Sequence, residues 1–201
     1  MTIKLIDAAE YYAGKNHQDK AWEYLQAKTD KRVLAEFAHI YRSDPATQNS
    51  NQLSKNFTLG ELIKSETATR RGIDNVPKNQ THLDNLRRTA VHILQPVRDH
   101  FGKPVIVSSG YRSPELNRAI GGSTTSQHSV GEAADFEIPG VSNLEVAKWI
   151  IYNLDFDQII LEYYNGRDPN SGWVHCSYTV RRANRRQSLS YNGGKYLVWR
   201  P

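Results

Sequence analysis

Apolar residues follow different patterns in the two parts of this chain. Within the first 42 residues they recur at i, i+3, i+4 and i+7, which predicts a helix. The positions with this spacing are Leu34, Phe37, Ala38 and Tyr41. A polar stretch without periodicity follows at residues 43–56 and is expected to be a linker. The pattern therefore predicts a helical N-terminal segment, residues 1–50, and a separate domain over residues 51–201.

The second part of the chain contains several helix signals. Residues that can cap a first helical turn predict helix starts at Thr58, Ser113 and Ser142. A longer helix is predicted over residues 81–101, which Gly102 is expected to end and Pro96 to bend. Its apolar face consists of Leu83, Leu86, Ala90, Ile93, Leu94 and Val97.

Short strand-like runs follow these helices. Strands are predicted over residues 104–109, 132–138, 157–163 and 173–179, and the last two are joined by a loop rich in turn formers. Residues 191–199 are expected to add a last strand or hairpin. Because helices precede a strand-rich half without regular alternation, the pattern indicates an α+β domain.

The composition excludes several classes of protein. The chain has 201 residues with a formal net charge of +5, and 38% of its residues are apolar, which is enough for a packed domain. No run approaches the roughly 18 apolar residues of a membrane span. Cys176 is the only cysteine, so an intramolecular disulfide is impossible. Acidic residues near the N-terminus speak against a signal peptide, so we expect synthesis in the cytoplasm.

A basic run near the C-terminus is a candidate site for polyanions. It contains Arg181, Arg182, Arg185 and Arg186. Such a run is typical of a solvated edge or of an anchor for acidic polymers, and it lacks the interleaved aromatic residues of a nucleic-acid site. We therefore expect no specific nucleic-acid partner and no membrane partner.

Two histidines and one aspartate have unusual surroundings. His128 precedes Asp135 by seven residues, and Asp135 lies in a predicted strand among alanines and a phenylalanine, where a charge requires a partner or a metal ion. His175 lies in another predicted strand. Two imidazoles and one carboxylate are a common ligand set for catalytic zinc, with a fourth position open for water. The alternative is a hydrogen-bonded core histidine with a loop aspartate, and spacing alone does not decide between the two.

The sequence around these residues resembles the zinc D-alanyl-D-alanine carboxypeptidases and the bacterial and phage L-alanyl-D-glutamate endopeptidases. The resemblance covers about residues 56–180 and comprises three motifs in the expected order. The residues that match the motifs are Ser109, Tyr111, Arg112 and Ser113; Ser126, His128, Gly131, Ala133 and Asp135; and Trp173 with His175. The resemblance implies an antiparallel sheet with flanking helices, of the kind found in these peptidases and in Hedgehog domains. It also implies that His128, Asp135 and His175 bind zinc.

One position departs from the pattern of these peptidases. Many members have a catalytic carboxylate three residues before the last ligand, but Gly172 stands there in this chain. Asp168 is the nearest upstream carboxylate and lies in a turn-rich loop. Glu162 ends the preceding predicted strand, and the resemblance to the Hedgehog signalling domain, a non-enzymatic relative, aligns it with a strand-end glutamate of that domain. We expect Glu162 to be the general base and then the general acid.

The resemblance implies roles for three further residues. Arg112 is expected to stabilise an oxyanion or to bind a substrate carboxylate, tasks suited to a charged, fork-shaped donor. Ser126 is expected to hydrogen-bond to the substrate, and Trp173 to form a wall of the cleft. Alternation along a strand directs Cys176 away from His175, so we expect Cys176 to be a buried apolar residue and not a nucleophile.

These features favour a zinc peptidase that cleaves the peptide stems of bacterial peptidoglycan, either as a D,D-carboxypeptidase or as an L-Ala-D-Glu type endopeptidase. The expected context is a phage lysin or a virion-associated hydrolase acting on the cell wall, with residues 1–50 available to virion proteins. The alternative is a zinc-containing binding module without catalytic activity, which the glycine at position 172 favours.

Overall fold

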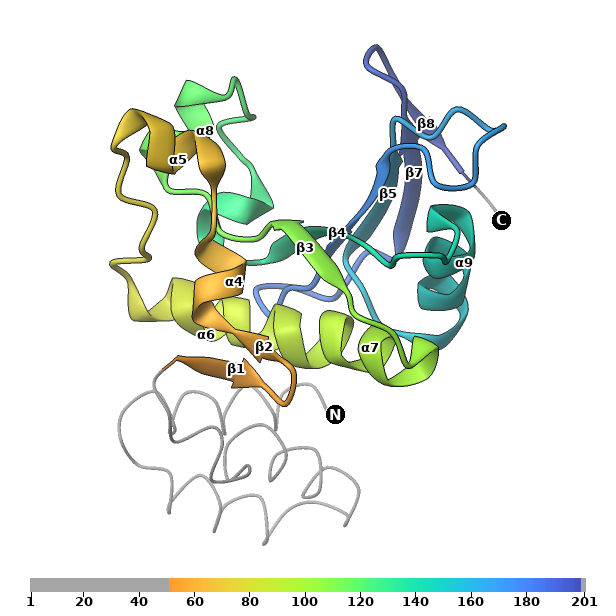
Figure 1. The fold of residues 1–201 in the computed structure, drawn as a ribbon, viewed down its shortest axis with the longest axis horizontal. Coiled ribbons are helices and arrows are strands. Elements are labelled where there is room, and N and C mark those ends of the chain that lie inside the picture. The colour runs from red at the N-terminus through yellow and green to blue at the C-terminus, as the bar shows by residue number, and fades with distance from the viewer. Residues whose placement is uncertain (1–50, 200–201) are drawn as a thin grey trace, which may run out of the picture. The chain divides into compact units, whose positions relative to one another are not determined.

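The computed structural model describes residues 51–199, and the helices predicted within residues 1–50 lie outside this range. The described part has an α+β fold in which helices cover a six-stranded sheet (Figure 1). The strands of this sheet are β3 (Ile106–Ser109), β4 (Ala133–Glu137), β5 (Gln158–Glu162), β6 (Trp173–Ser177), β7 (Gln187–Tyr191) and β8 (Tyr196–Val198). The predicted fold class is confirmed.

The helices begin at the capping residues that the sequence indicates. Thr58 and Glu61 form a complete capping box, while the hydroxyls of Ser113 and Ser142 accept backbone N–H bonds from their first turns. Two short helical elements, α5 and η3, were not predicted. The helical elements are α4 (Leu59–Ile63), α5 (Glu66–Arg71), α6 (Gln80–Thr89), η2 (Ala90–Leu94), α7 (Gln95–Phe101), α8 (Pro114–Ala119), η3 (Gln127–Val130) and α9 (Asn143–Asn153). Among the described residues, no helix combines the length and apolar character needed to cross a membrane.

The predicted long helix is present but contains a turn of π-helix. This turn, η2, separates α6 from α7 and ends two residues before Pro96. Proline has no N–H to donate to the carbonyl four residues earlier, so the helix there is free to widen. The N–H of Gln95 reaches the carbonyl of Ala90, and Gly102 ends the helix at φ 63° as expected.

The predicted linker over residues 43–56 is wrong at its C-terminal end. Strand β1 (Gln52–Ser54) pairs with β2 (Phe57–Thr58), and the Leu53 and Phe57 side chains are buried in the core. The side chain of Gln95 holds this hairpin, because its Oε1 accepts bonds from the Ser54 hydroxyl (3.0 Å) and the Asn56 N–H (2.9 Å). These bonds join residues about forty positions apart, which a local polar pattern does not reveal.

The two faces of the large sheet have different environments. Side chains such as Ala134, Ile159 and Cys176 pack in the core together with apolar residues of α6, η2, α7 and α9. Alternation along the strands directs Asp135, Ile160 and His175 to the opposite face. One face therefore forms the core, and the other presents polar side chains.

The sheet is mixed, whereas an antiparallel sheet was expected. Its order is β3-β4-β6-β5-β7-β8, and β5 and β7 run parallel while the other neighbours are antiparallel. The chain leaves β6, passes the end of β5 and forms β7 on the other side of β5. Strand β5 therefore has an antiparallel neighbour, β6, and a parallel neighbour, β7. The last strand or hairpin expected over residues 191–199 is a hairpin of β7 and β8, but its first strand begins earlier than predicted, at Gln187.

Candidate metal centre

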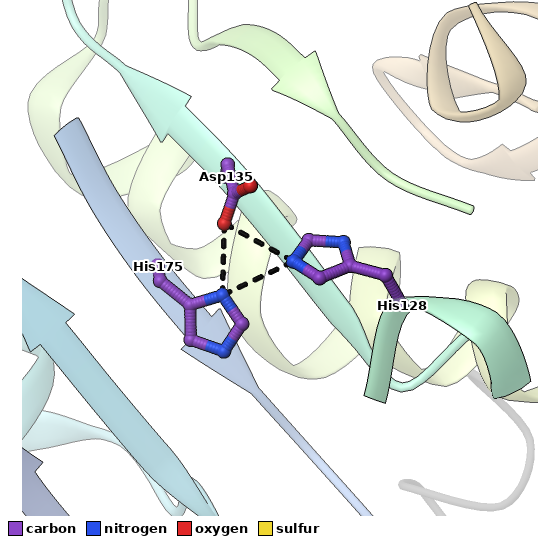
Figure 2. A group of neighbouring side chains, drawn as sticks. All are labelled: His128, Asp135 and His175. Atoms are coloured by element: carbon purple, nitrogen blue, oxygen red, sulfur yellow. Dashed lines mark hydrogen bonds and ion pairs between the residues drawn. The ribbon is translucent and has the colours of Figure 1, made fainter. Parts of the chain in front are cut away.

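Three side chains from separate elements meet at one point on the polar face of the sheet. His128 comes from η3, Asp135 from β4 and His175 from β6, and all three are buried (Figure 2). Asp135 Oδ1 lies 3.2 Å from His128 Nε2 and 2.8 Å from His175 Nδ1, and the two nitrogens are 3.2 Å apart. Donors bound to one tetrahedral zinc ion would be about 3.3 Å apart. The three residues predicted as ligands therefore have the spacing of a shared cation.

The strand register explains why Asp135 and His175 face each other. They are direct partners in the antiparallel pair of β4 and β6, so their side chains project from the same face of the sheet. The guanidinium of Arg112 binds the other oxygen of Asp135 through Nη2, and its Nε donates to the Ser109 hydroxyl (2.8 Å). Arg112 thus leaves Oδ1 of Asp135 directed at the two histidines.

His128 is oriented by a backbone carbonyl on one side of its ring and by the contacts that hold η3 in place. Its Nδ1 lies 2.7 Å from the carbonyl oxygen of Gly110, which can only accept, so Nδ1 carries the proton and Nε2 presents its lone pair to the cluster. Gly131 ends η3 at φ 78°, a conformation that glycine adopts without strain. The Thr89 hydroxyl of α6 donates to the Gly131 carbonyl (3.1 Å) and so ties η3 to the long helix.

The charges of the cluster suit a divalent cation. Burial would raise the pKa of Asp135, but the neighbouring His128 and His175 hold that pKa well below its ordinary value, so the carboxylate stays ionised. Burial lowers the pKa of His128 despite the adjacent carboxylate, which favours the neutral ring that a metal requires. An ionised carboxylate and an imidazole nitrogen with a free lone pair converge here, so these residues fit zinc as ligands.

Gly110 is expected to be essential for the orientation of His128. A Cβ added at Gly110 would lie 2.3 Å from the Leu62 carbonyl oxygen, so Gly110→Ala must move the backbone whose carbonyl holds the ring. We expect the zinc affinity of Gly110→Ala to fall by about 10–100-fold, the usual effect of losing an outer hydrogen bond to a ligand. Competition with a chromophoric chelator measures this affinity. Gly60→Ala, whose added Cβ meets nothing closer than 3.9 Å, serves as the control, and equal affinities of the two variants would contradict the prediction.

A cleft of about 800 Å³ opens over the cluster. Five of the seven predicted site residues line it, namely Arg112, Ser126, His128, Glu162 and His175. Burial raises the pKa of Glu162, and so does the nearby Asp135 charge, while His175 and Arg112 oppose these effects. A carboxylate with a raised pKa beside a metal site is suited to accept and return a proton.

Trp173 is not among the residues that line this cleft. It pairs across the strands with Glu162, and its ring lies 5.2 Å from the ring of Tyr163. Its predicted role as a wall of the cleft has no support in this geometry.

The structure explains why position 172 carries no carboxylate. Gly172 has φ 68°, and a Cβ there would lie 1.7 Å from the carbonyl oxygen of Glu162. Only glycine fits where the chain returns into β6. Asp168 is exposed, accepts an N–H bond from Asn170 within its loop (2.9 Å) and does not line the cleft. Among the described residues that line the cleft, Glu162 is the only glutamate or aspartate.

Placing the usual carboxylate at position 172 is therefore expected to damage the protein. We expect Gly172→Asp to lower the free energy of unfolding by at least about 2 kcal/mol, because it combines a backbone clash with a positive φ. Urea denaturation of the metal-free protein measures this loss. Gly166→Asp is the matched control, since Gly166 has a similar φ of 74° but nothing within 4 Å of an added Cβ. A Gly172→Asp variant no less stable than this control would contradict the steric explanation.

Cys176 and the basic run occupy different environments in the structure. Cys176 is fully buried among core residues, and burial raises the pKa of its thiol, consistent with an apolar role. All four arginines of the basic run contact carboxylates, so the run is not a set of free charges, while an anchor for acidic polymers stays a prediction. Arg181 binds Glu132, Arg182 and Arg185 bind Asp157, and Arg186 lies 3.8 Å from Asp155.

Sequence reasoning missed several residues that build the site. Asn75 accepts the N–H of Ser113 (2.7 Å) and donates to the Tyr111 carbonyl (2.9 Å), so it fixes the segment that carries Arg112. Gly110 was not recognised as the partner of His128. Its position inside a matched motif is the only signal that could have identified it. The group that binds His128 is a backbone carbonyl, which every residue has, so the residue type gives no indication of this role.

The comparisons with known proteins agree with this geometry. No curated protein matches the chain. A family model described as peptidase M15 matches residues 55–177, a range that contains Glu162 and all three residues of the cluster. This match covers more than half of the chain, and the chain belongs to the peptidase M15 family.

Proposed function

We propose that this protein is a zinc-dependent peptidase that hydrolyses peptide bonds in the stems of bacterial peptidoglycan. The observation that carries the proposal is the convergence of His128, Asp135 and His175 in a cleft that Glu162 also lines. Membership of the peptidase M15 family supports peptide hydrolysis. The resemblance of the three motifs to carboxypeptidases and endopeptidases of the cell wall supports peptidoglycan as the substrate.

His128 Nε2, Asp135 Oδ1 and His175 Nδ1 would hold the zinc ion. When bound, zinc supplies a Lewis acid for the peptide carbonyl and lowers the pKa of water toward about 7. Asp135 offsets part of the charge of the ion, and Arg112 keeps that carboxylate in place through its second oxygen. The hydrogen bond to Gly110 holds the His128 ring in the tautomer that leaves Nε2 free.

Glu162 would act in both halves of the reaction. As a carboxylate it accepts a proton from the attacking water, and its raised pKa makes that transfer favourable. The protonated Glu162 then donates to the nitrogen of the leaving amine. Glu162 and His175 project from one face of the β5–β6 pair, two positions out of direct register, so the base lies beside the metal site and not on it.

Arg112 and Ser126 would bind the substrate. The Nε and Nη2 atoms of Arg112 contact Ser109 and Asp135, and the guanidinium has a further nitrogen, Nη1, for a carbonyl or carboxylate oxygen. Ser126 lines the cleft directly before η3, and its hydroxyl can bond to a peptide group. Both side chains lie on the His128 side of the cleft, so a peptide would lie between them and Glu162.

Mass spectrometry of purified peptidoglycan after digestion tests this function. We expect new stem fragments with zinc and none after treatment with a chelator. The masses identify the cleaved bond, and so distinguish a D,D-carboxypeptidase from an L-Ala-D-Glu type endopeptidase. Stoichiometric zinc binding without any new fragment would overturn the proposal in favour of a binding module that lacks catalysis.

A phage lysin or virion-associated hydrolase is the biological context that the resemblance to phage endopeptidases favours. In that context, residues 1–50 would be the segment available to virion proteins. Retention of virion proteins by the full chain, and loss of this retention when residues 1–50 are deleted, would support the assignment. Equal retention by both forms would contradict it.

A further inference from the structure

Three arginines from one loop form part of the lining of the cleft. Arg181, Arg182 and Arg185, which we call the arginine wall, come from the loop between β6 and β7 and line the same cleft as the candidate metal centre. The sequence predicts a solvated edge or an anchor for acidic polymers here. These side chains line the cleft together with Gln158, and this position favours a role in binding a ligand.

Two buried carboxylates hold the arginine wall in position. Glu132 is fully buried and accepts two bonds from Arg181, from Nε (2.7 Å) and from Nη2 (2.6 Å). Asp157 is also fully buried and accepts bonds from Arg185 Nη2 (2.6 Å) and Arg182 Nη2 (2.8 Å). Such charge-assisted bonds restrict the rotamers of long side chains, so less entropy is lost when a ligand binds.

The wall retains positive charge after these pairings. Three guanidinium groups face two carboxylates, which leaves an excess of one positive charge. Burial would raise the pKa of Asp157, but its bonds to Arg185 and the charge of Arg182 hold that pKa below its ordinary value, so the carboxylate stays ionised. The side chains of Arg181, Arg182 and Arg185 are 56%, 42% and 43% exposed, so each still presents part of its surface to the cleft.

The strand register gives the distance between the wall and the metal centre. Ile160 is the direct partner of His175, and Gln158, at the wall end, precedes Ile160 by two residues, which is about 7 Å along a strand. Glu162 lies at the same spacing on the other side of Ile160. An extended peptide spans about 3.3–3.6 Å per residue, so a group at the wall is about two residues from a bond at the metal centre.

We propose that the arginine wall is a specificity site that binds a free carboxylate of the substrate, about two residues from the bond that is cut. This inference rests on the proposed function, since it assigns the part of a peptidoglycan stem that the enzyme selects. Guanidinium groups form paired bonds with carboxylates, and the excess positive charge of the wall favours an anionic ligand. A carboxylate on the substrate would balance this excess charge.

Substrates that differ by one amide test the site. Two synthetic stem peptides are compared, one with a free side carboxylate two residues from the cleaved bond and one with that group amidated. For the zinc-loaded wild type we expect amidation to raise KM about tenfold with little change in kcat. In Arg182→Gln we expect the difference in KM to fall below twofold. Asp157 keeps its bonds to Arg185 in this variant, so no buried charge loses all its partners.

Arg118→Gln is the matched control, because Arg118 is an exposed arginine of α8 that does not line the cleft. We expect it to keep the tenfold preference. Equal KM values of the wild type for the two peptides, or full preference in Arg182→Gln, would overturn the proposal. If a phosphodiester polymer of the cell wall competes for the site while amidation has no effect, the ligand is that polymer and the proposal is wrong.

Binding measurements separate this proposal from the proposed function. Calorimetric titration of both peptides into the metal-free protein reports the wall without any hydrolysis. Preference for the free carboxylate that is lost in Arg182→Gln supports the arginine wall even if no peptide is cut. Hydrolysis without any such preference supports the peptidase and rejects the wall as a specificity site.

Discussion

Glu162→Gln is expected to reduce peptide hydrolysis by about 10²–10⁴-fold, the usual contribution of a positioned general acid–base. The amide has nearly the shape of the carboxylate but cannot accept the proton of the attacking water. Because Glu162 is not one of the three converging ligands, zinc should still bind with the affinity of the wild type. Rates measured on a purified stem peptide, together with the zinc content of the same sample, test both statements.

The stability of Glu162→Gln distinguishes loss of chemistry from loss of fold. A raised pKa in the folded state means that the wild type loses stability as the pH rises through the ordinary pKa of the carboxyl group toward the folded value. The amide does not titrate, so at neutral pH the metal-free variant should be at least as stable as the wild type, and this advantage should disappear in acid. Glu115→Gln, in the exposed first turn of α8, should leave the rate unchanged and lower the free energy of unfolding by no more than about 1 kcal/mol, through loss of a charge at the helix N-terminus. Full activity of Glu162→Gln would refute the assignment of the base.

Asp135→Asn is expected to lower zinc affinity more than 100-fold, beyond the 10–100-fold typical of outer partners. The variant removes the negative charge among the three ligands and leaves Arg112 facing a neutral amide. Zinc at about 1,000 times its Kd stabilises a folded protein by about 4 kcal/mol. For a domain of this size that corresponds to a rise in Tm of roughly 10 °C in the wild type. We expect almost no rise in Asp135→Asn.

Asp168→Asn is the control for this experiment. It changes the same residue type in an exposed loop outside the cleft, so zinc should raise its Tm as in the wild type. A circular dichroism spectrum of metal-free Asp135→Asn checks that the fold is intact. An equal zinc-dependent rise in Tm for Asp135→Asn and the wild type would mean that the ion binds elsewhere.

Local patterns predicted most of the fold because they depend on neighbouring residues. The capping residues Thr58, Ser113 and Ser142 act within one helical turn, and the strands show in short apolar runs. The parallel pairing of β5 with β7 and the π-helical turn before Pro96 were not predicted. The pairing of strands depends on the path of the chain between them, which local patterns do not show. A π-helical turn leaves the same residues on the apolar face of the helix, so the apolar pattern does not reveal it.

The candidate metal centre was predictable where its residues are chemically distinctive. Asp135 was identified as an aspartate in an apolar strand, and His128 and His175 by the motifs that resemble those of zinc peptidases. Alternation along β6 identified Cys176 as a core residue. The arginine wall was not predictable, because Glu132 and Arg181 are 49 positions apart and each is charged. Charged residues beside strands are ordinarily exposed to solvent, and only the folded chain shows that the Glu132 carboxylate is buried and paired with an arginine.

Anomalous diffraction at the zinc absorption edge, from crystals of the zinc-loaded protein, shows directly whether these three side chains hold one ion. We expect one zinc ion per chain, with His128 Nε2, His175 Nδ1 and Asp135 Oδ1 about 2.0–2.2 Å from it. No bound zinc, or an ion held by other residues, would contradict it.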